Sequence, residues 1–247
     1  METPRVPSIL ITGGASGIGR ATALLLARRG ARVLVADVDD AAAASLIAEA
    51  GEAADRIRYR RTDVTDEAQV RAAVADALAA HGGLDALIAV AGVMRGQMVE
   101  IGAFDEATWD LVVDTNLKGA FLAAKHAAIP MLAAGQGTIV LVGSKAGVTA
   151  GSGSFAYGAS KGGTHGLAMT LERHLGPKGI RVNDLCPGDV DTPLMRRSLD
   201  EAIRNGADPV AIERIRAGLT PPAAVADVIA FLVSDAAAAV RGTVFTA

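Results

Sequence analysis

The chain has 247 residues, of which 51% are hydrophobic and 21% are charged, and its formal net charge is −3. This composition is typical of a packed globular protein and argues against a disordered chain. The small negative charge predicts no binding to nucleic acid or to an anionic membrane surface. Apolar runs such as residues 87–91 are far shorter than the roughly 20 residues of a membrane span, and residues 1–7 lack the apolar segment of a signal peptide.

Short β-branched segments alternate along the chain with alanine-rich segments of helical period, which is typical of βαβ units and a parallel sheet. These strands show no polar alternation, so we expect helices on both faces of the sheet. With neither a linker nor an internal repeat, residues 1–247 are predicted to form one α/β domain of the Rossmann type. In chain order, strands and helices are predicted at 8–12 (strand), 17–29 (helix), 32–37 (strand), 41–50 (helix), 57–61 (strand), 67–81 (helix), 86–90 (strand), 106–133 (helix), 137–142 (strand), 157–175 (helix), 181–185 (strand), 223–232 (helix) and 243–245 (strand).

A glycine-rich loop, Thr12-Gly13-Gly14-Ala15-Ser16-Gly17-Ile18-Gly19, joins the first predicted strand to the first helix. Glycines let the backbone turn tightly and approach a pyrophosphate, and the free N–H groups of the new helix attract anions. The spacing is G-x-x-x-G-x-G, because Thr22 occupies the position of a third glycine. We predict a dinucleotide-binding loop, since it lies between a strand and a helix. The predicted contacts are Gly13, Ser16, Gly17, Ile18 and Gly19.

Asp37 ends the second predicted strand, eighteen residues after Gly19. A carboxylate there can accept hydrogen bonds from the adenosine ribose and would repel a 2′-phosphate, so NAD is the predicted cofactor. Asp39 is better placed than Asp37 to cap the following helix. Asp63, after the third strand, is placed to meet the adenine with Val64 as an apolar wall; a role as a carboxylate at the start of a helix stays open.

Tyr157 and Lys161 lie four residues apart at the start of a predicted helix, so both side chains share one helix face. A tyrosine with an ordinary pKa of about 10 is a poor general base at neutral pH. We expect the lysine cation to lower the pKa of the phenol, and an oxidised nicotinamide to add to the effect. The pair is common by chance and gains meaning only from other motifs.

Together and in order, these motifs resemble those of the short-chain dehydrogenase/reductase family, in its short single-domain branch. The resemblance covers nearly the whole chain. It implies a seven-stranded parallel sheet, a nicotinamide cofactor, and hydride transfer to or from a carbonyl carbon. The matching motifs are the loop at 12–19, Asp63-Val64, Ala91-Gly92, Asn116 in Thr-Asn-Leu-Lys-Gly, Ser144, Tyr157 with Lys161, and Pro187-Gly188.

The resemblance also implies a role for each catalytic residue. Ser144, at the sheet edge where open parallel sheets bind ligands, would polarise the substrate oxygen, and Tyr157 would exchange its proton. Lys161 would hold the nicotinamide ribose and lower the tyrosine pKa. Asn116, a poor helix former within a predicted helix, would anchor a water that relays protons to Lys161. The remaining cofactor contacts implied are Ala91, Gly92, Pro187, Gly188, Val190 and Thr192.

Two features depart from the family pattern. Val90 stands where relatives have an asparagine that ties the fourth and fifth strands together, so we expect an altered local network. The chain ends at Ala247, where relatives continue into a glycine-rich tail. We expect either a clipped chain or an abbreviated terminal strand.

About thirty residues, from Pro193 to Pro222, separate the sixth strand from the last helix. A compact domain rarely carries so long an excursion, and we predict a substrate lid, with a decorative helical insertion as the alternative. Asp189 either accepts a hydrogen bond from a substrate or caps the lid. Plausible pocket residues are Met94, Arg95, Val148, Phe155, Leu194 and Met195.

The cysteine and histidine residues predict neither a disulfide nor a metal site. Cys186 is the only cysteine, which fits a reducing cytoplasm, and its apolar neighbours favour a buried thiol. The histidines lack the spacing of metal ligands, and we expect them on helix surfaces. They are His81, His126, His165 and His174.

The favoured hypothesis is an NAD-dependent enzyme that interconverts a small-molecule secondary alcohol and its ketone, as a cytoplasmic homotetramer packed through its alanine-rich helices. One alternative is an NADPH-dependent reductase of 3-oxoacyl thioesters on a carrier protein. Arg196 and Arg197 favour it and Asp37 argues against it. The other is a cofactor-sensing regulator that has lost its chemistry. The presence of Ser144, Tyr157, Lys161 and Asn116 argues against that.

Overall fold

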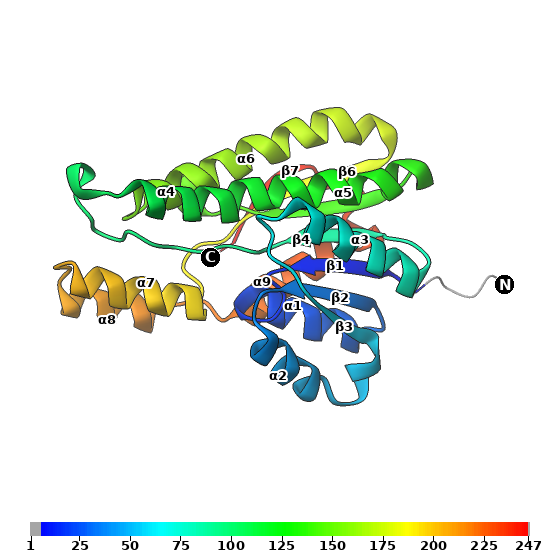
Figure 1. Cartoon of the computed structure of the whole chain (residues 1–247), viewed down its shortest axis with the longest axis horizontal. Helices are drawn as coiled ribbons and strands as arrows, with labels where there is room; N and C mark the ends of the chain where they lie inside the picture. Colours follow the sequence, from blue (N-terminus) through cyan, green and yellow to red (C-terminus); the bar gives the residue numbers. More distant parts are fainter. Residues whose placement is uncertain (1–5, 247) are drawn as a thin grey trace.

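Among residues 6–246, which the computed structural model describes, seven parallel strands form one sheet in the order β3-β2-β1-β4-β5-β6-β7 (Figure 1). The predicted seven-stranded parallel sheet is confirmed, and each strand end lies within one residue of its expected position. The strands are β1 (Ser8–Thr12), β2 (Arg32–Asp37), β3 (Ile57–Arg61), β4 (Ala86–Ala89), β5 (Gly137–Val142), β6 (Ile180–Cys186) and β7 (Gly242–Phe245).

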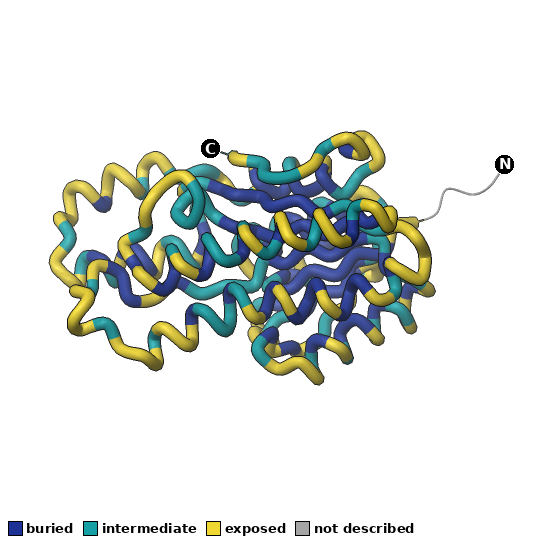
Figure 2. The backbone as a smooth tube through the Cα atoms, turned by 90° about the horizontal axis from the view of Figure 1, so that it is seen from above, coloured by how far each residue is buried: buried dark blue, intermediate teal, exposed yellow. Residues whose placement is uncertain are grey.

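Helices cover both faces of the sheet, as predicted. Ile9 and Ile11 of β1 pack into one apolar cluster with α1, α2 and α9, whereas Leu10 packs into a second with α3, α5 and α6. Both faces are therefore buried (Figure 2), which is why the strands lack polar alternation. No helix within the described residues is long and apolar enough to span a membrane. The helices are α1 (Gly17–Arg28), α2 (Asp40–Ala50), α3 (Glu67–His81), α4 (Glu106–Val113), α5 (Gly119–Ala134), α6 (Phe155–Leu175), α7 (Pro193–Arg204), α8 (Pro209–Ala217) and α9 (Pro222–Leu232).

The single helix predicted over residues 106–133 is divided in the structure. A π-helical segment, Asp114–Lys118, separates α4 from α5. A π-turn inserts one extra residue into the helix and is common at functional sites. It carries Asn116, whose side chain bonds the backbone of Val93 instead of facing solvent. Gly119, directly after the turn, lies where a Cβ would come within 2.7 Å of the Val64 side chain.

The excursion between β6 and α9 contains two helices, α7 and α8, which extend beyond the sheet at one end of the molecule (Figure 1). They form a small apolar cluster of their own around Leu199, Ala202 and Ile212. Short helical turns complete the fold. They are Gly51–Arg56, Ile101–Ala103, η4 (Lys145–Gly147), Gly176–Lys178 and Asp235–Ala237.

Three histidines depart from the prediction of helix-surface positions. His165 is half-buried, and its Nδ1 lies 2.8 Å from a carboxylate oxygen of Asp184. His81 is buried and its Nδ1 lies 2.9 Å from the Ser8 hydroxyl. His126 is also buried, with Nε2 3.0 Å from a carboxylate oxygen of Glu67. Each ring finds a polar partner on another element, which allows it to leave water. Cys186 is buried at the end of β6, as expected.

Candidate active site

The loops that follow β1, β4 and β6 meet at the carboxyl edge of the sheet. A Cβ on Gly13 would come within 2.5 Å of the Ala91 Cα, and one on Gly17 within 3.0 Å of the Thr192 side chain. A Cβ on Gly92 would in turn lie 3.2 Å from the Asn116 Oδ1. Because β1 lies between β2 and β4, this edge is the place where open α/β sheets bind ligands. The predicted cofactor residues from three loops are therefore neighbours.

The glycine loop depends on residues without a side chain. Gly13 and Gly17 adopt φ values of 70° and 52°, which favour glycine. A side chain on Gly19 would collide with the Gly13 carbonyl. Thr22 is buried, and its hydroxyl donates a 2.8 Å hydrogen bond to the Ile18 carbonyl within α1. The tight turn thus leads directly into the N-terminus of α1. One helical turn later, Thr22 fits at the position of a third glycine because its hydroxyl is bonded within the helix.

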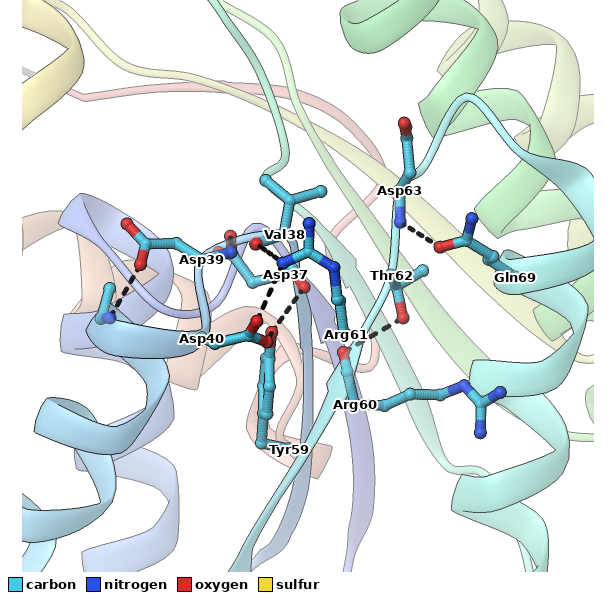
Figure 3. A network of polar contacts seen from close by, with 11 residues as sticks. Asp37, Val38, Asp39, Asp40, Tyr59, Arg60, Arg61, Thr62, Asp63 and Gln69 are labelled. Atoms are coloured by element: carbon cyan, nitrogen blue, oxygen red, sulfur yellow. Dashed lines mark hydrogen bonds and ion pairs between the residues drawn. The ribbon is translucent and has the colours of Figure 1, made fainter.

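Asp37 is half-buried at the end of β2 (Figure 3) and is hydrogen-bonded to the glycine loop. Its Oδ2 accepts a 2.9 Å hydrogen bond from the Ala15 amide, and its Oδ1 accepts one of 3.1 Å from the Asp39 amide. Asp39, not Asp37, caps α2 by accepting from Ala42, as predicted. The Asp37 carboxylate is therefore fixed in place and is not needed to begin the helix.

Each arginine near Asp37 is paired with another carboxylate. The Arg20 guanidinium lies 2.6 Å from a carboxylate oxygen of Glu49, which is on α2. Arg60 is paired with Asp76 of α3. Arg61 is the nearest in the sheet, being in register with Asp37, and binds Asp40 at 3.0 Å as well as the Val38 carbonyl (Figure 3).

Asp63 and Val64 follow β3 at the same edge. The Asp63 carboxylate accepts hydrogen bonds from the amide and hydroxyl of Thr65, at 2.9 Å and 2.8 Å. The cap of α3 is Asp66, which accepts from the amides of Ala68 and Gln69. The alternative that Asp63 starts this helix is therefore wrong. Val64 is buried and packs against α5 at Gly119.

Ser144, Tyr157 and Lys161 converge where β5 meets the first turns of α6. Tyr157 and Lys161 are only 8% and 5% exposed. The Lys161 ammonium donates a 2.7 Å hydrogen bond to the Val142 carbonyl and lies 5.8 Å from the centre of the Tyr157 ring. α6 can approach because a side chain on Gly147 of η4 would collide with its backbone. One hydroxyl, one phenol and one ammonium therefore share a small volume.

The electrostatics of this cluster differ from the expectation that Lys161 lowers the pKa of Tyr157. Burial raises the pKa of the Tyr157 phenol to about 12, and a hydrogen bond with Ser144 offsets this only in part. Burial also lowers the pKa of the Lys161 ammonium to about 8. Loss of hydration disfavours the charged form of each group. At neutral pH the protein's own groups thus keep the phenol protonated.

Asn116 is buried in the π-helical segment and joins two parts of the site. Its Oδ1 accepts from the Val93 amide at 2.7 Å, and its Nδ2 donates to the Val93 carbonyl at 3.0 Å and to the Ser160 hydroxyl at 2.9 Å. The loop after β4 is therefore tied to α6 through this amide. Val90, which stands where relatives have an asparagine, is half-buried and packs against the apolar cluster of α1 and α9. Ser160, which directly precedes Lys161, was not predicted from the sequence to be part of the site.

The loop after β6 leads into the two-helix excursion, residues 193–222. The Pro187 carbonyl accepts from the Lys145 amide at 3.0 Å, which joins this loop to the end of β5. Thr192 caps α7, and the buried Val190 pairs with Thr220. These contacts hold the loop that follows Pro187-Gly188 between the end of β5 and the start of α7.

α7 is hydrogen-bonded to the loop that follows β4. Glu201 of α7 accepts a 2.9 Å hydrogen bond from the Gly96 amide, and Asn205 donates one of 2.7 Å to the Gln97 carbonyl. Among the predicted pocket residues, Met94 and Leu194 pack in one apolar cluster with Tyr157. The excursion therefore lies beside the residues around Tyr157.

Comparisons with known proteins agree with this geometry. The sequence profile of the family described as short chain dehydrogenase matches residues 7–202. Cis-4-hydroxycyclohexanecarboxylate dehydrogenase of Sinomonas cyclohexanicum is 40% identical over 95% of this chain and 92% of its own length. The 3-oxoacyl-(acyl-carrier-protein) reductase of Thermotoga maritima is 36% identical over 95% of this chain and 93% of its own.

Among solved structures, levodione reductase superposes with a TM-score of 0.90 and 32% identity, over 98% of this chain and 96% of that chain. A profile that matches most of the chain and relatives that match nearly all of it show the family. The chain belongs to the short chain dehydrogenase family and is an oxidoreductase that acts on CH–OH groups with a nicotinamide cofactor.

Proposed function

We propose that the chain is an NAD-dependent enzyme that interconverts a secondary alcohol and the corresponding ketone, with Tyr157 as its proton-transferring residue. The convergence of Ser144, Tyr157 and Lys161 in one cluster carries this proposal. The nicotinamide supplies or accepts the hydride. The protein must then hold the substrate oxygen and move one proton to or from it.

The side chains of the cluster are suited to holding the substrate oxygen and to moving a proton. The hydroxyl of Ser144 and the phenol of Tyr157 are two O–H donors for the substrate oxygen, whose negative charge increases as the C–H bond is made or broken. In ketone reduction the protonated Tyr157 donates its proton to that oxygen. In alcohol oxidation the phenol first gives up its proton to solvent, and the phenolate then receives the proton of the alcohol. Lys161 carries a positive charge at neutral pH, because its pKa is about 8, and holds the nicotinamide ribose. Asn116 keeps α6 in register with the loop after β4.

The residues at the glycine loop fit NAD. The tight turn at Gly13–Gly19 and the N-terminus of α1 suit the pyrophosphate. Asp37 suits the adenosine ribose, and Asp63 with Val64 suits the adenine. Asp37 is half-exposed, which leaves lone pairs on its carboxylate for the ribose hydroxyls. The loops at Ala91-Gly92 and from Pro187 to Thr192 complete the cofactor site.

Residues 193–222 serve in this proposal as the substrate lid. Helix α7 is hydrogen-bonded to the loop after β4 and contributes Leu194 to the cluster around Tyr157. A lid in that position excludes water from the reacting atoms. The alternative of a 3-oxoacyl thioester reductase has a relative in its favour. However, Arg196, one of its two proposed docking residues, is held by Asp191 through hydrogen bonds of 2.6 Å and 2.7 Å.

The test is a screen of the purified protein with NAD⁺ and secondary alcohols, and with NADH and the matching ketones. The reaction is monitored by the absorbance of the reduced nicotinamide, which rises in oxidation and falls in reduction. Ring alcohols such as 4-hydroxycyclohexanecarboxylate belong in the panel, because a 40% identical relative is named for that substrate. We expect turnover of at least one alcohol–ketone pair. If the protein turns over a 3-oxoacyl thioester with NADPH and no simple alcohol or ketone, the proposal is wrong.

We further propose that the enzyme is a homotetramer with two-fold axes. Large apolar side chains are exposed on α4, α5 and α6, where a symmetric partner would cover them. Light scattering at micromolar concentration should give four times the chain mass, and replacing Phe121 by Asp should reduce it. A monomeric mass for the unmodified chain would contradict this proposal. The exposed residues are Trp109, Leu111, Phe121, Ile129, Leu132 and Met169.

A further inference from the structure

A buried polar cluster lies behind Lys161, between α6 and the centre of β6. The side chain of Asp184 is fully buried, and its Oδ2 lies 2.8 Å from His165 Nδ1 and 3.1 Å from the Cys186 thiol. The hydroxyl oxygen of Thr243, on the neighbouring strand β7, lies 3.3 Å from the same His165 nitrogen. None of these residues was singled out from the sequence as part of the catalytic site.

The other oxygen of Asp184 has no hydrogen-bond partner among the described residues. A buried carboxylate with an unpaired oxygen is costly, and an apolar residue at such a position generally stabilises a protein more. The fold makes room for this group. A Cβ on Gly143 would come within 2.5 Å of the free Oδ1 of Asp184 and 3.0 Å of the Cys186 sulfur.

Lys161 lies one helical turn before His165 on α6 and also points toward β5. Tyr157, Lys161 and His165 are spaced four residues apart and form one stripe on α6, and His165 meets the Asp184 carboxylate directly. The Lys161 ammonium is bonded to the carbonyl of Val142, the residue immediately before Gly143. The unpaired Asp184 oxygen and the buried ammonium thus approach the same stretch of β5.

We propose that Asp184 is a positioning residue whose buried carboxylate keeps Lys161 in its charged form, and that His165 and Cys186 hold this carboxylate in place. The inference rests on the proposed function, because it gives Lys161 a role only in an enzyme that needs an ammonium beside Tyr157. Asp184 does not touch the reacting atoms and acts through Lys161.

The balance of charges around Lys161 supports this. Burial is the largest influence and lowers the pKa of the ammonium to about 8, whereas Asp184 and, more weakly, Cys186 raise it. The remaining ionisable groups near the site are Tyr157 and His165 on α6, Asp189 after β6, which acts on Tyr157, and Lys145 on η4. Removal of the Asp184 charge therefore lowers the Lys161 pKa further.

The test is the pH dependence of kcat with NAD⁺ in the Asp184→Asn variant. Lys161 is charged below its pKa, so a lower pKa brings the loss of activity on the alkaline side to a lower pH. In the pH profile of kcat, we expect the alkaline limb, where activity is lost, to move to lower pH by about one unit. At pH values above this limb, kcat of the variant should be about tenfold lower than that of the unmodified enzyme. Asp227→Asn is the control, since it removes an exposed carboxylate with the same change in net charge. His165→Gln, which retains the carboxylate, should shift the limb much less.

A second measurement needs no turnover. In protein labelled with ¹³C-lysine, the Lys161 signal, identified by its loss in Lys161→Arg, should titrate at a lower pH in Asp184→Asn than in the unmodified chain. If Asp184→Asn does not fold, Asp184→Ser leaves room for a water and serves instead. Unchanged titration of Lys161 in a folded variant, or an equal shift in Asp227→Asn, would overturn the inference. If Lys161 titrates as expected but no alcohol is oxidised, only the proposed function fails.

Discussion

Tyr157→Phe retains the affinity for NAD and loses nearly all turnover, by about 10²- to 10⁴-fold. The substitution removes one oxygen and leaves the ring that packs with Met94 and Val112. The protein therefore keeps its fold, and the substrate oxygen loses both a hydrogen-bond donor and the group with which it exchanges its proton. The rate is measured with saturating NAD⁺ and alcohol, and the affinity by calorimetric titration of NAD.

The other tyrosine of the chain, Tyr59, provides a matched control. Tyr59 lies near the other end of the proposed cofactor site, where its hydroxyl oxygen is 2.6 Å from a carboxylate oxygen of Asp40 and 3.0 Å from the Asp37 carbonyl oxygen, so its single proton is shared between them. Tyr59→Phe should leave kcat unchanged at saturating NAD⁺. Retention of more than about a tenth of the normal rate by Tyr157→Phe at neutral pH would show that another group transfers the proton.

The enzyme should prefer NAD to NADP by about 10²-fold or more in kcat/KM. A carboxylate that accepts hydrogen bonds from the ribose hydroxyls contributes about 1.5–3 kcal/mol for NAD, and each 1.4 kcal/mol is a factor of about ten. For NADP the same carboxylate of Asp37 meets a 2′-phosphate of like charge. The nearby cations do not offset this, because Arg20, Arg60 and Arg61 are each held by another carboxylate.

Asp37→Ala should lower kcat/KM for NAD and narrow the gap to NADP. Asp39→Ala is the matched control: it removes the same charge two residues away, but its effect should be on the stability of α2, which Asp39 caps. It should leave the preference between the cofactors nearly unchanged. Equal kcat/KM for NAD and NADP in the unmodified enzyme would contradict the role given to Asp37. So would an undiminished preference in Asp37→Ala.

The strands could be predicted closely because burial on both faces imposes continuous apolar segments, as at Ile9–Ile11. The break between α4 and α5 was missed. At the break, Asn116 accepts a hydrogen bond from the Val93 backbone, 23 residues earlier in the chain, and such a pairing leaves no periodic signal. The buried positions of His81 and His126 were missed for the same reason. Their partners, Ser8 and Glu67, lie 73 and 59 residues away.

Within the site, residue types and order were enough to locate Tyr157 beside Lys161, because both lie on one helix. Their ionisation was not predictable in this way. The sequence shows that a cation is near the phenol, but the loss of water from both groups depends on the packing of β5 and α6. The role of Asp184 was not predicted either. An acidic residue within an apolar strand indicates a function only once its contacts with His165 and Cys186 are known.

The contacts of the glycine loop have a consequence for how this enzyme can diverge. Gly13, Gly19 and Ala91 pack backbone against backbone, so nearly every substitution at the two glycines would push the chain apart. Asp37, by contrast, has its side chain half in solvent and contacts the turn through one hydrogen bond, which it accepts from the Ala15 amide. Descendants of this chain can therefore exchange one nicotinamide coenzyme for the other by changes at the end of β2, while the two glycines of the turn stay fixed.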